Sequence, residues 1–111
     1  VKKELYSAQL YYNLGTYFGN CTNGGSNYQA CIITAQNALN DYPYSELRED
    51  FALLIVKSKF ELAEQSVESK RIDRYRDAED ECYGFINEYP DSKSRSLAEK
   101  YINICKKYVK D

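Results

Sequence analysis

The sequence predicts an all-α fold, and three observations lead to that prediction. Apolar residues recur at intervals of three and four along most of the chain, and the alternation typical of strands is absent. The 111 residues contain 2 prolines, Pro43 and Pro90, and each follows a helical pattern. Hydrophobic residues make up 43% of the chain and charged residues 29%, which is enough for a core with a charged surface. The length predicts a single domain spanning residues 1–111.

We expect about five antiparallel helices, at residues 2–19, 27–42, 46–69, 72–89 and 94–109. The apolar stripe of the first helix contains Leu5, Ala8, Tyr12, Gly15 and Phe18. The stripe of the second contains Tyr28, Cys31, Ile32, Ala35, Ala38, Leu39 and Tyr42. The third, expected to be the longest, contains Leu47, Phe51, Leu54, Ile55, Ser58 and Leu62. The fourth contains Tyr75, Ala78, Cys82, Phe85, Ile86 and Tyr89. The fifth contains Leu97, Ala98, Tyr101, Ile102, Cys105 and Tyr108. Each spacing places its set on one face of a helix.

Two similar phrases, "NDYPYSELRED" and "NEYPDSKSRSL", separate the second helix from the third and the fourth from the fifth. A proline disfavours helical backbone at the residue before it, so each preceding helix should stop just ahead of the proline. Ser45, and Ser92 or Ser94, can then cap the next helix by accepting a hydrogen bond from a free backbone N–H. The remaining break, at residues 19–27, is rich in glycine and asparagine and is expected to be a surface turn.

The similarity extends beyond the two turns. The prolines lie 47 residues apart (90 − 43), and the same offset aligns Tyr28 with Tyr75 and Arg48 with Arg95. Matches on both sides of the proline indicate a duplicated helix–turn–helix unit. A period of this kind is typical of a solenoid, in which each helix pair buries its face against its neighbours.

These residues resemble the tetratricopeptide repeat. The first-helix positions of that family correspond to Leu14, Gly15 and Phe18. The second-helix positions correspond to Tyr28, Cys31, Ala35, Ala38 and Pro43, and in the second copy to Tyr75, Ala78, Cys82, Phe85 and Pro90. The resemblance implies a right-handed solenoid of helical hairpins. The chain departs from the family in a longer loop at 19–27 and in an extended third helix, which lengthens the repeat.

A more specific resemblance covers nearly the whole chain. The segments "SVESKRIDRYRDAEDECYGFINEYPDSKSRSLAEKY", "YYNLGTYF" and "NALNDYPYSELRED" are similar to the C-terminal region of BamD-type lipoproteins of the outer-membrane β-barrel assembly machinery, in their Bacteroidetes form. The resemblance implies a location at the periplasmic face of the outer membrane and docking onto the periplasmic domains of the barrel-forming assembly protein. Because such proteins are longer and carry a lipidated N-terminal cysteine, we expect this chain to be a fragment anchored through a segment upstream.

Composition argues against several other classes of function. A formal charge of −2 and a pI near 5.2 do not favour nucleic-acid binding, which needs clustered basic residues. The 4 cysteines have no paired spacing and the chain has no histidine, so neither a metal site nor a cysteine or serine nucleophile with a histidine base is expected. No glycine-rich phosphate loop is present. We therefore expect a protein without cofactors that is not an enzyme, with its cysteines mostly buried as thiols.

The candidate partner-binding residues come from the tyrosines and from the end of the third helix. Most of the 12 tyrosines are expected to pack between helices, but exposed ones such as Tyr11 and Tyr44 can anchor a partner. The charged candidates are Glu61, Glu64, Arg71 and Arg74.

Two alternatives remain open from the sequence. One is a periplasmic coordinator of cell division of the Tol–Pal type, whose repeats have similar turns but lack the extended third helix. The other is a glycan-capturing lipoprotein of the SusD type, which embeds such helices among long loops rich in tryptophan. This chain has no tryptophan, which disfavours the second alternative.

Overall fold

Within the part of the chain that the structure describes, five α-helices account for most of the residues. The computed structural model describes residues 1–18 and 24–109, and no strand occurs within those two ranges. The helices are α1 (Lys2–Phe18), α2 (Gly24–Asp41), α3 (Arg48–Glu64), α4 (Glu68–Glu88) and α5 (Arg95–Val109). This is the all-α class that the sequence predicts.

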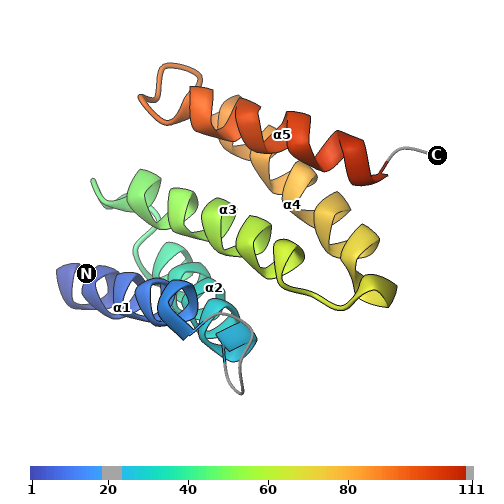
Figure 1. The fold of residues 1–111 in the computed structure, drawn as a ribbon. Helices are drawn as coiled ribbons and strands as arrows, with labels where there is room; N and C mark the ends of the chain where they lie inside the picture. Colours follow the sequence, from blue (N-terminus) through green and yellow to red (C-terminus); the bar gives the residue numbers. More distant parts are fainter. Residues whose placement is uncertain (19–23, 110–111) are drawn as a thin grey trace.

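The helices stack in chain order, with α3 in the middle (Figure 1). Each helix packs against the next one, and α1 also packs against α3. On the other side of α3, the ring of Phe60 stacks on Tyr101 of α5 with ring centroids 4.1 Å apart. The helices α1, α3 and α5 therefore form one row, and α2 and α4 each pack against two members of it.

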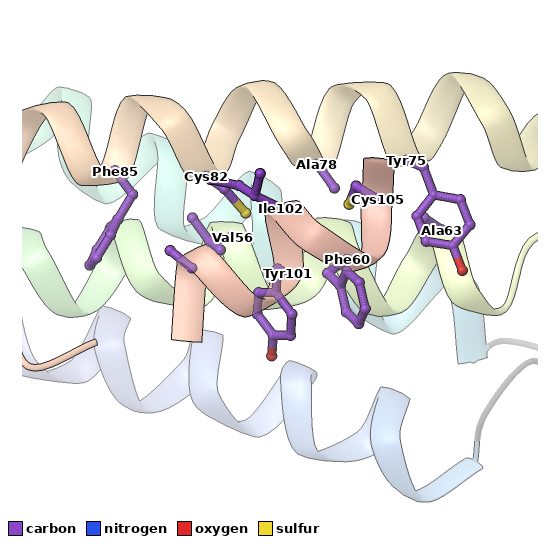
Figure 2. Packing of buried hydrophobic residues seen from close by; sticks show 11 residues of the cluster. Val56, Phe60, Ala63, Tyr75, Ala78, Cys82, Phe85, Tyr101, Ile102 and Cys105 are labelled. Atoms are coloured by element: carbon purple, nitrogen blue, oxygen red, sulfur yellow. The ribbon is translucent and has the colours of Figure 1, made fainter. Parts of the chain in front are cut away.

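The largest part of the core lies between α3, α4 and α5 (Figure 2). Its buried members are Val56, Phe60, Ala63, Tyr75, Ala78, Cys82, Phe85, Ala98, Tyr101, Ile102 and Cys105. Smaller clusters join α3 to α2 through Phe51 and Ile55, and to α1 through Leu54. Burying each large side chain stabilises the fold by about 1.5 to 3 kcal/mol. Because α3 contributes to every cluster, it holds the two halves of the chain together.

Burial repeats with the period seen in the sequence. The buried residues of α2 are Tyr28, Cys31, Ala35 and Ala38, and those of α4 are Tyr75, Ala78, Cys82 and Phe85. Each pair is 47 residues apart. The buried residues of α5 likewise correspond to Phe51, Leu54, Ile55 and Ser58 of α3. The duplication is therefore present in the packing as well as in the amino-acid sequence.

The two proline turns also have the same hydrogen bonds. The amide of Ser45 donates to Tyr42 O at 3.1 Å, and the amide of Ser92 donates to Tyr89 O at 3.0 Å. Each serine hydroxyl then accepts a bond of 3.0 Å from the amide two residues later, at Leu47 or Ser94. The serines therefore close the turn ahead of the helix, whereas the sequence predicted that they cap the helix itself. For this reason α3 and α5 begin slightly later than expected.

The third helix differs most from its prediction. It ends at Glu64 instead of extending to residue 69, and the 21-residue α4 is the longest helix. The buried Ser66 hydroxyl bonds back to Leu62 O, and Val67 is extended, with φ −63° and ψ 153°. A serine that bonds to the preceding turn favours a helix end over a continuing helix. The lengthened repeat therefore comes from two long helices and a break, with no single extended helix.

Candidate interaction surfaces

A groove separates the N-terminal halves of α1 and α3. Its volume is about 370 Å³, and its lining residues are Lys2, Leu5, Tyr6, Gln9, Asp50, Leu53, Leu54 and Lys57. The floor is apolar, because Leu54 is buried and Leu5 packs beside it. Lysines stand at both ends, and the exposed ring of Tyr6 forms part of the rim. An apolar floor with charged and aromatic edges is typical of a surface that binds a peptide or helix.

Further along α3, the half-buried Glu61 carboxylate lies among tyrosines. Burial raises the pKa values of Tyr12, Tyr28 and Tyr101, and the Glu61 charge raises each of them further. Burial, and next the neighbouring Glu64 carboxylate, raises the pKa of Glu61 itself. The Lys57 ammonium, and next a hydrogen bond from Tyr12, act in the opposite direction. The charged form of Glu61 therefore carries a cost in stability, which is common at functional positions.

Tyr28 fixes the position of α1 against α2. Its hydroxyl lies 3.2 Å from Thr16 Oγ1 and accepts a bond of 3.4 Å from the Gln65 side chain of α3. Its ring packs against Tyr12, with centroids 5.7 Å apart, and against the backbone at Gly15. The Lys57 ammonium lies 4.6 Å from the centroid of the Tyr12 ring, within the range of a cation–π contact. These contacts connect the groove to the surroundings of Glu61.

The turn between α3 and α4 brings together the charged candidates predicted from the sequence. Glu64 accepts a bond of 3.1 Å from the Tyr75 hydroxyl, and its carbonyl accepts one of 3.4 Å from Arg71. Arg74 donates to the Ser66 hydroxyl. Both arginines are half-buried and contact the turn, so the structure gives them a role in closing it. Their role in binding a partner stays a prediction.

The two tyrosine candidates lie apart from this cluster. Tyr44, in the turn between α2 and α3, is 92% exposed, and Tyr11, on α1, is 37% exposed. Of the predicted repeat positions whose side chains the structure describes, all are buried except three: Leu14 is half-buried, and Pro43 and Pro90 are exposed in their turns. A fourth, Phe18, ends α1, and its side chain lies outside the described residues.

Sequence reasoning missed Leu53 and Lys57 in the groove, because it assigned α3 a single apolar stripe. The segment "FALLIV" in α3 is apolar on more than one side, and Phe51, Leu54, Ile55 and Val56 are all buried. A helix that is apolar around most of its circumference is packed on several sides. That feature of the sequence was sufficient to indicate that α3 is the central helix.

The thiols are buried. Cys31, Cys82 and Cys105 are free cysteines, whereas Cys21 lies outside the described residues. Burial raises the pKa values of Cys82 and Cys105 to about 12. Within residues 1–18 and 24–109, no group of three or more histidine, cysteine or acidic side chains is placed to hold a metal ion. No helix in this described part has the length and hydropathy required to cross a membrane.

Comparison of the chain with protein-family models, with curated proteins and with solved structures gives no match.

Proposed function

We propose that this chain is a non-catalytic scaffold for protein–protein interaction, built as a tetratricopeptide-like solenoid of helical hairpins. Within that class, the resemblance of the sequence favours a BamD-like subunit of the outer-membrane β-barrel assembly machinery. Its partners would be the periplasmic domains of the assembly protein, and other assembly lipoproteins. Its place would be the periplasmic face of the outer membrane, reached through a lipid anchor on an upstream segment.

The observation that carries the proposal is the duplicated hairpin. The same buried positions and the same turn hydrogen bonds recur 47 residues apart, which is expected of stacked repeat units. Repeat units of this type present a row of alternate helices to a ligand. Here that row consists of α1, α3 and α5.

Two features of the row support partner binding. The α1/α3 groove offers an apolar floor of about 370 Å³ between charged edges. Nearby, the half-buried Glu61 lies beside Glu64, and burial disfavours its charged form. A polar residue that reduces stability in a surface otherwise suited to packing is more readily explained by binding than by folding.

A second candidate is the periplasmic coordinator of the Tol–Pal type. The extended third helix was the sequence feature that separated the two candidates, and α3 ends at Glu64. Without that extension the BamD-like assignment rests on the similarity of the segments alone. A glycan-capturing lipoprotein is disfavoured, since the chain has no tryptophan.

The test is affinity purification of the native full-length protein from detergent-solubilised envelopes, with identification of the proteins recovered. Recovery with a β-barrel assembly protein that carries periplasmic repeat domains is the expected result. Recovery from the soluble periplasm with Tol–Pal components would replace the leading proposal with the second. A Tyr6→Asp variant at the groove rim should lose the partner. The matched Ile33→Asp variant, at an exposed position on α2, should retain it.

A further inference from the structure

The outer side of α4 and α5 has a hollow of about 440 Å³, which we call the α4/α5 surface. The residues that define it are Tyr83, Ile86, Arg95, Glu99, Ile102, Asn103 and Lys106. Ile86, Ile102 and the exposed ring of Tyr83 provide its apolar part, while Glu99, Asn103 and Lys106 are exposed. Arg95 pairs with Glu99 at 3.3 Å.

The repeat supplies a second copy of this surface that is covered. Subtracting 47 from each position gives Gln36, Leu39, Arg48, Ala52, Ile55, Val56 and Lys59, on α2 and α3. In that copy α4 packs over the surface: Gly84, Phe85 and Glu88 line the same hollow as Leu39, Arg48 and Ala52. The covered copy therefore shows which kind of element fits the open one, namely an amphipathic helix.

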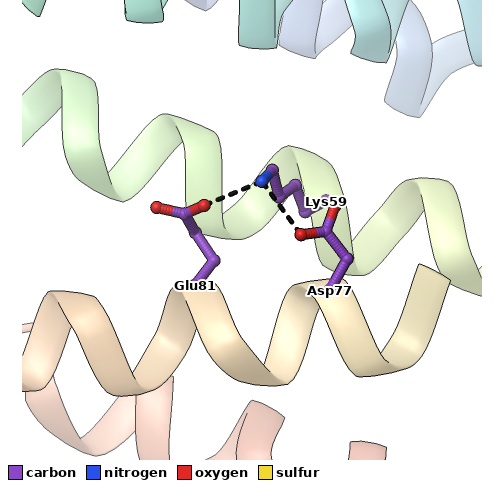
Figure 3. Close-up of polar contacts among 3 residues, drawn as sticks. All are labelled: Lys59, Asp77 and Glu81. Atoms are coloured by element: carbon purple, nitrogen blue, oxygen red, sulfur yellow. Dashed lines mark hydrogen bonds and ion pairs between the residues drawn. The ribbon is translucent and has the colours of Figure 1, made fainter. Parts of the chain in front are cut away.

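Charge complementarity anchors α4 on the covered copy. Lys59 Nζ donates to Asp77 Oδ1 at 3.2 Å and to Glu81 Oε1 at 2.8 Å (Figure 3). The Lys59 side chain is 15% exposed. Burial lowers its pKa, but the two carboxylates, and Glu81 most of all, more than offset that effect and keep the pKa above its usual value. The recognition element of α4 is thus a pair of carboxylates four residues apart, directed at one lysine.

The open copy retains the lysine and the apolar floor but differs at other positions, among them Tyr83 in place of Gln36. Lys106 occupies the position of Lys59 and has no ion pair within the part of the chain that the structure describes. Glu99 and Asn103 replace Ala52 and the fully buried Val56. A permanent core contact does not favour such replacements, whereas a more polar interface is typical of a reversible one.

We propose that the α4/α5 surface docks an amphipathic α-helix of a partner protein that carries two carboxylates four residues apart, with Lys106 binding them as Lys59 binds those of α4. The proposal rests on the scaffold function proposed above and specifies its partner. A second copy of this chain does not fit well, because its own carboxylates at Asp77 and Glu81 are already bound to Lys59.

The probe is a synthetic peptide with the sequence of α4, residues 68–88. A lactam bridge between positions 76 and 80, with Arg76→Lys, holds it helical, since both positions are exposed. Fluorescence anisotropy with the whole chain gives the Kd, and amide chemical shifts give the location. We expect saturable binding and shifts at Ile86, Ile102, Asn103 and Lys106. No binding by the helical peptide at millimolar concentration, or shifts confined to the α1/α3 groove, would overturn the proposal.

Charge-reversal variants test the lysine directly. Lys106→Glu should weaken binding about tenfold, the effect of losing one desolvated charge pair. Lys3→Glu, the same change at an exposed position of α1, should leave the Kd unaltered. A peptide with Asp77→Lys and Glu81→Lys should prefer the Lys106→Glu chain over the natural one. If the natural and charge-reversed peptides bind the natural and Lys106→Glu chains with equal affinity, Lys106 does not bind the two carboxylates of the peptide. Self-association of the chain that Lys106→Glu abolishes would make the occupant a second copy and would also overturn it.

The failure of this inference can be distinguished from failure of the scaffold function. If the native full-length protein recovers its partner equally well with and without Lys106→Glu, the scaffold stands and this surface is not its docking site. If the peptide binds as expected but the native protein recovers no partner protein, the surface is competent and the proposed scaffold function is wrong.

Discussion

Replacing glycine by alanine should have opposite effects on stability at two helical positions, Gly15 and Gly84. At Gly15 a methyl group would lie 2.8 Å from Tyr28 Cδ1 and Cε1 and 2.9 Å from Cζ. Tyr28 is fully buried, and Thr16 and Gln65 contact its hydroxyl, so the ring has little room to move. At Gly84, on α4, a methyl group would meet no atom within 4 Å. Gly15→Ala and Gly84→Ala are therefore a matched pair within helices.

The magnitudes follow from two terms. Alanine is more favourable than glycine inside a helix by about 1 kcal/mol, and this gain applies at both sites. Overpacking in a well-packed core costs about 1 to 3 kcal/mol, and it applies only at Gly15. Gly84→Ala should therefore raise the free energy of unfolding by up to about 1 kcal/mol. Gly15→Ala should lower it by as much as about 2 kcal/mol, because the packing cost offsets the helix gain.

Urea unfolding followed by circular dichroism at 222 nm measures both variants against the natural chain. The difference between the variants, about 1 to 3 kcal/mol, is the informative quantity, since the helix term cancels in it. In thermal unfolding it corresponds to a separation of several degrees. Equal stabilisation by the two substitutions would refute the close packing of Tyr28 against α1.

Three further predictions follow from the charged and titratable groups. Lys59→Met should lower the free energy of unfolding, measured in urea, by about 1 kcal/mol, whereas Lys106→Met should change it by no more than about 0.5 kcal/mol. Equal losses would contradict the ion pairs assigned to Lys59. Burial, and next Glu64, raises the pKa of Glu61, so its stabilising contribution is present below pH 4.5 and lost as the pH rises through the folded pKa. Glu61→Gln should therefore raise the melting temperature at pH 7 and have little effect near pH 3.5, and a gain of similar size at both pH values would exclude ionisation as its cause. Burial raises the pKa values of Cys82 and Cys105 to about 12, above the 9.0 of free thiols, so the folded state retains protons that the unfolded state releases. The free energy of unfolding should fall by up to about 1.4 kcal/mol per pH unit for each thiol between about pH 9 and 12. Alkylation of both thiols at pH 7 should be slow. Fast labelling of either thiol in the native protein would show that it is not buried.

The helices and the two turns could be predicted from the sequence because their determinants are local. Apolar spacing fixes the buried face, and Pro43 and Pro90 end α2 and α4 within two residues of the proline. The end of α3 could not be predicted. The segment at Gln65 and Ser66 has neither glycine nor proline, and its break depends on the Ser66 hydroxyl, which Arg74 contacts from the next helix.

The candidate surfaces were predictable to a smaller extent. The sequence identified Glu61 and Glu64, and the structure places both beside the tyrosines of neighbouring helices. The α1/α3 groove joins residues far apart in the chain, such as Tyr6 and Leu53, which are 47 positions apart (53 − 6), and no local pattern relates them. Exposed tyrosines likewise cannot be separated from packed ones by spacing, since both types occur on the same helices.

By itself, the sequence determined the helical class, the duplication and the positions of the proline turns, since each depends on residues near one another in the chain. The tertiary structure decided which faces are covered. Lys59 and Lys106 occupy equivalent positions in the repeat, yet α4 buries one and leaves the other exposed. That difference arises from the order in which helices pack, which a residue and its neighbours in sequence do not encode.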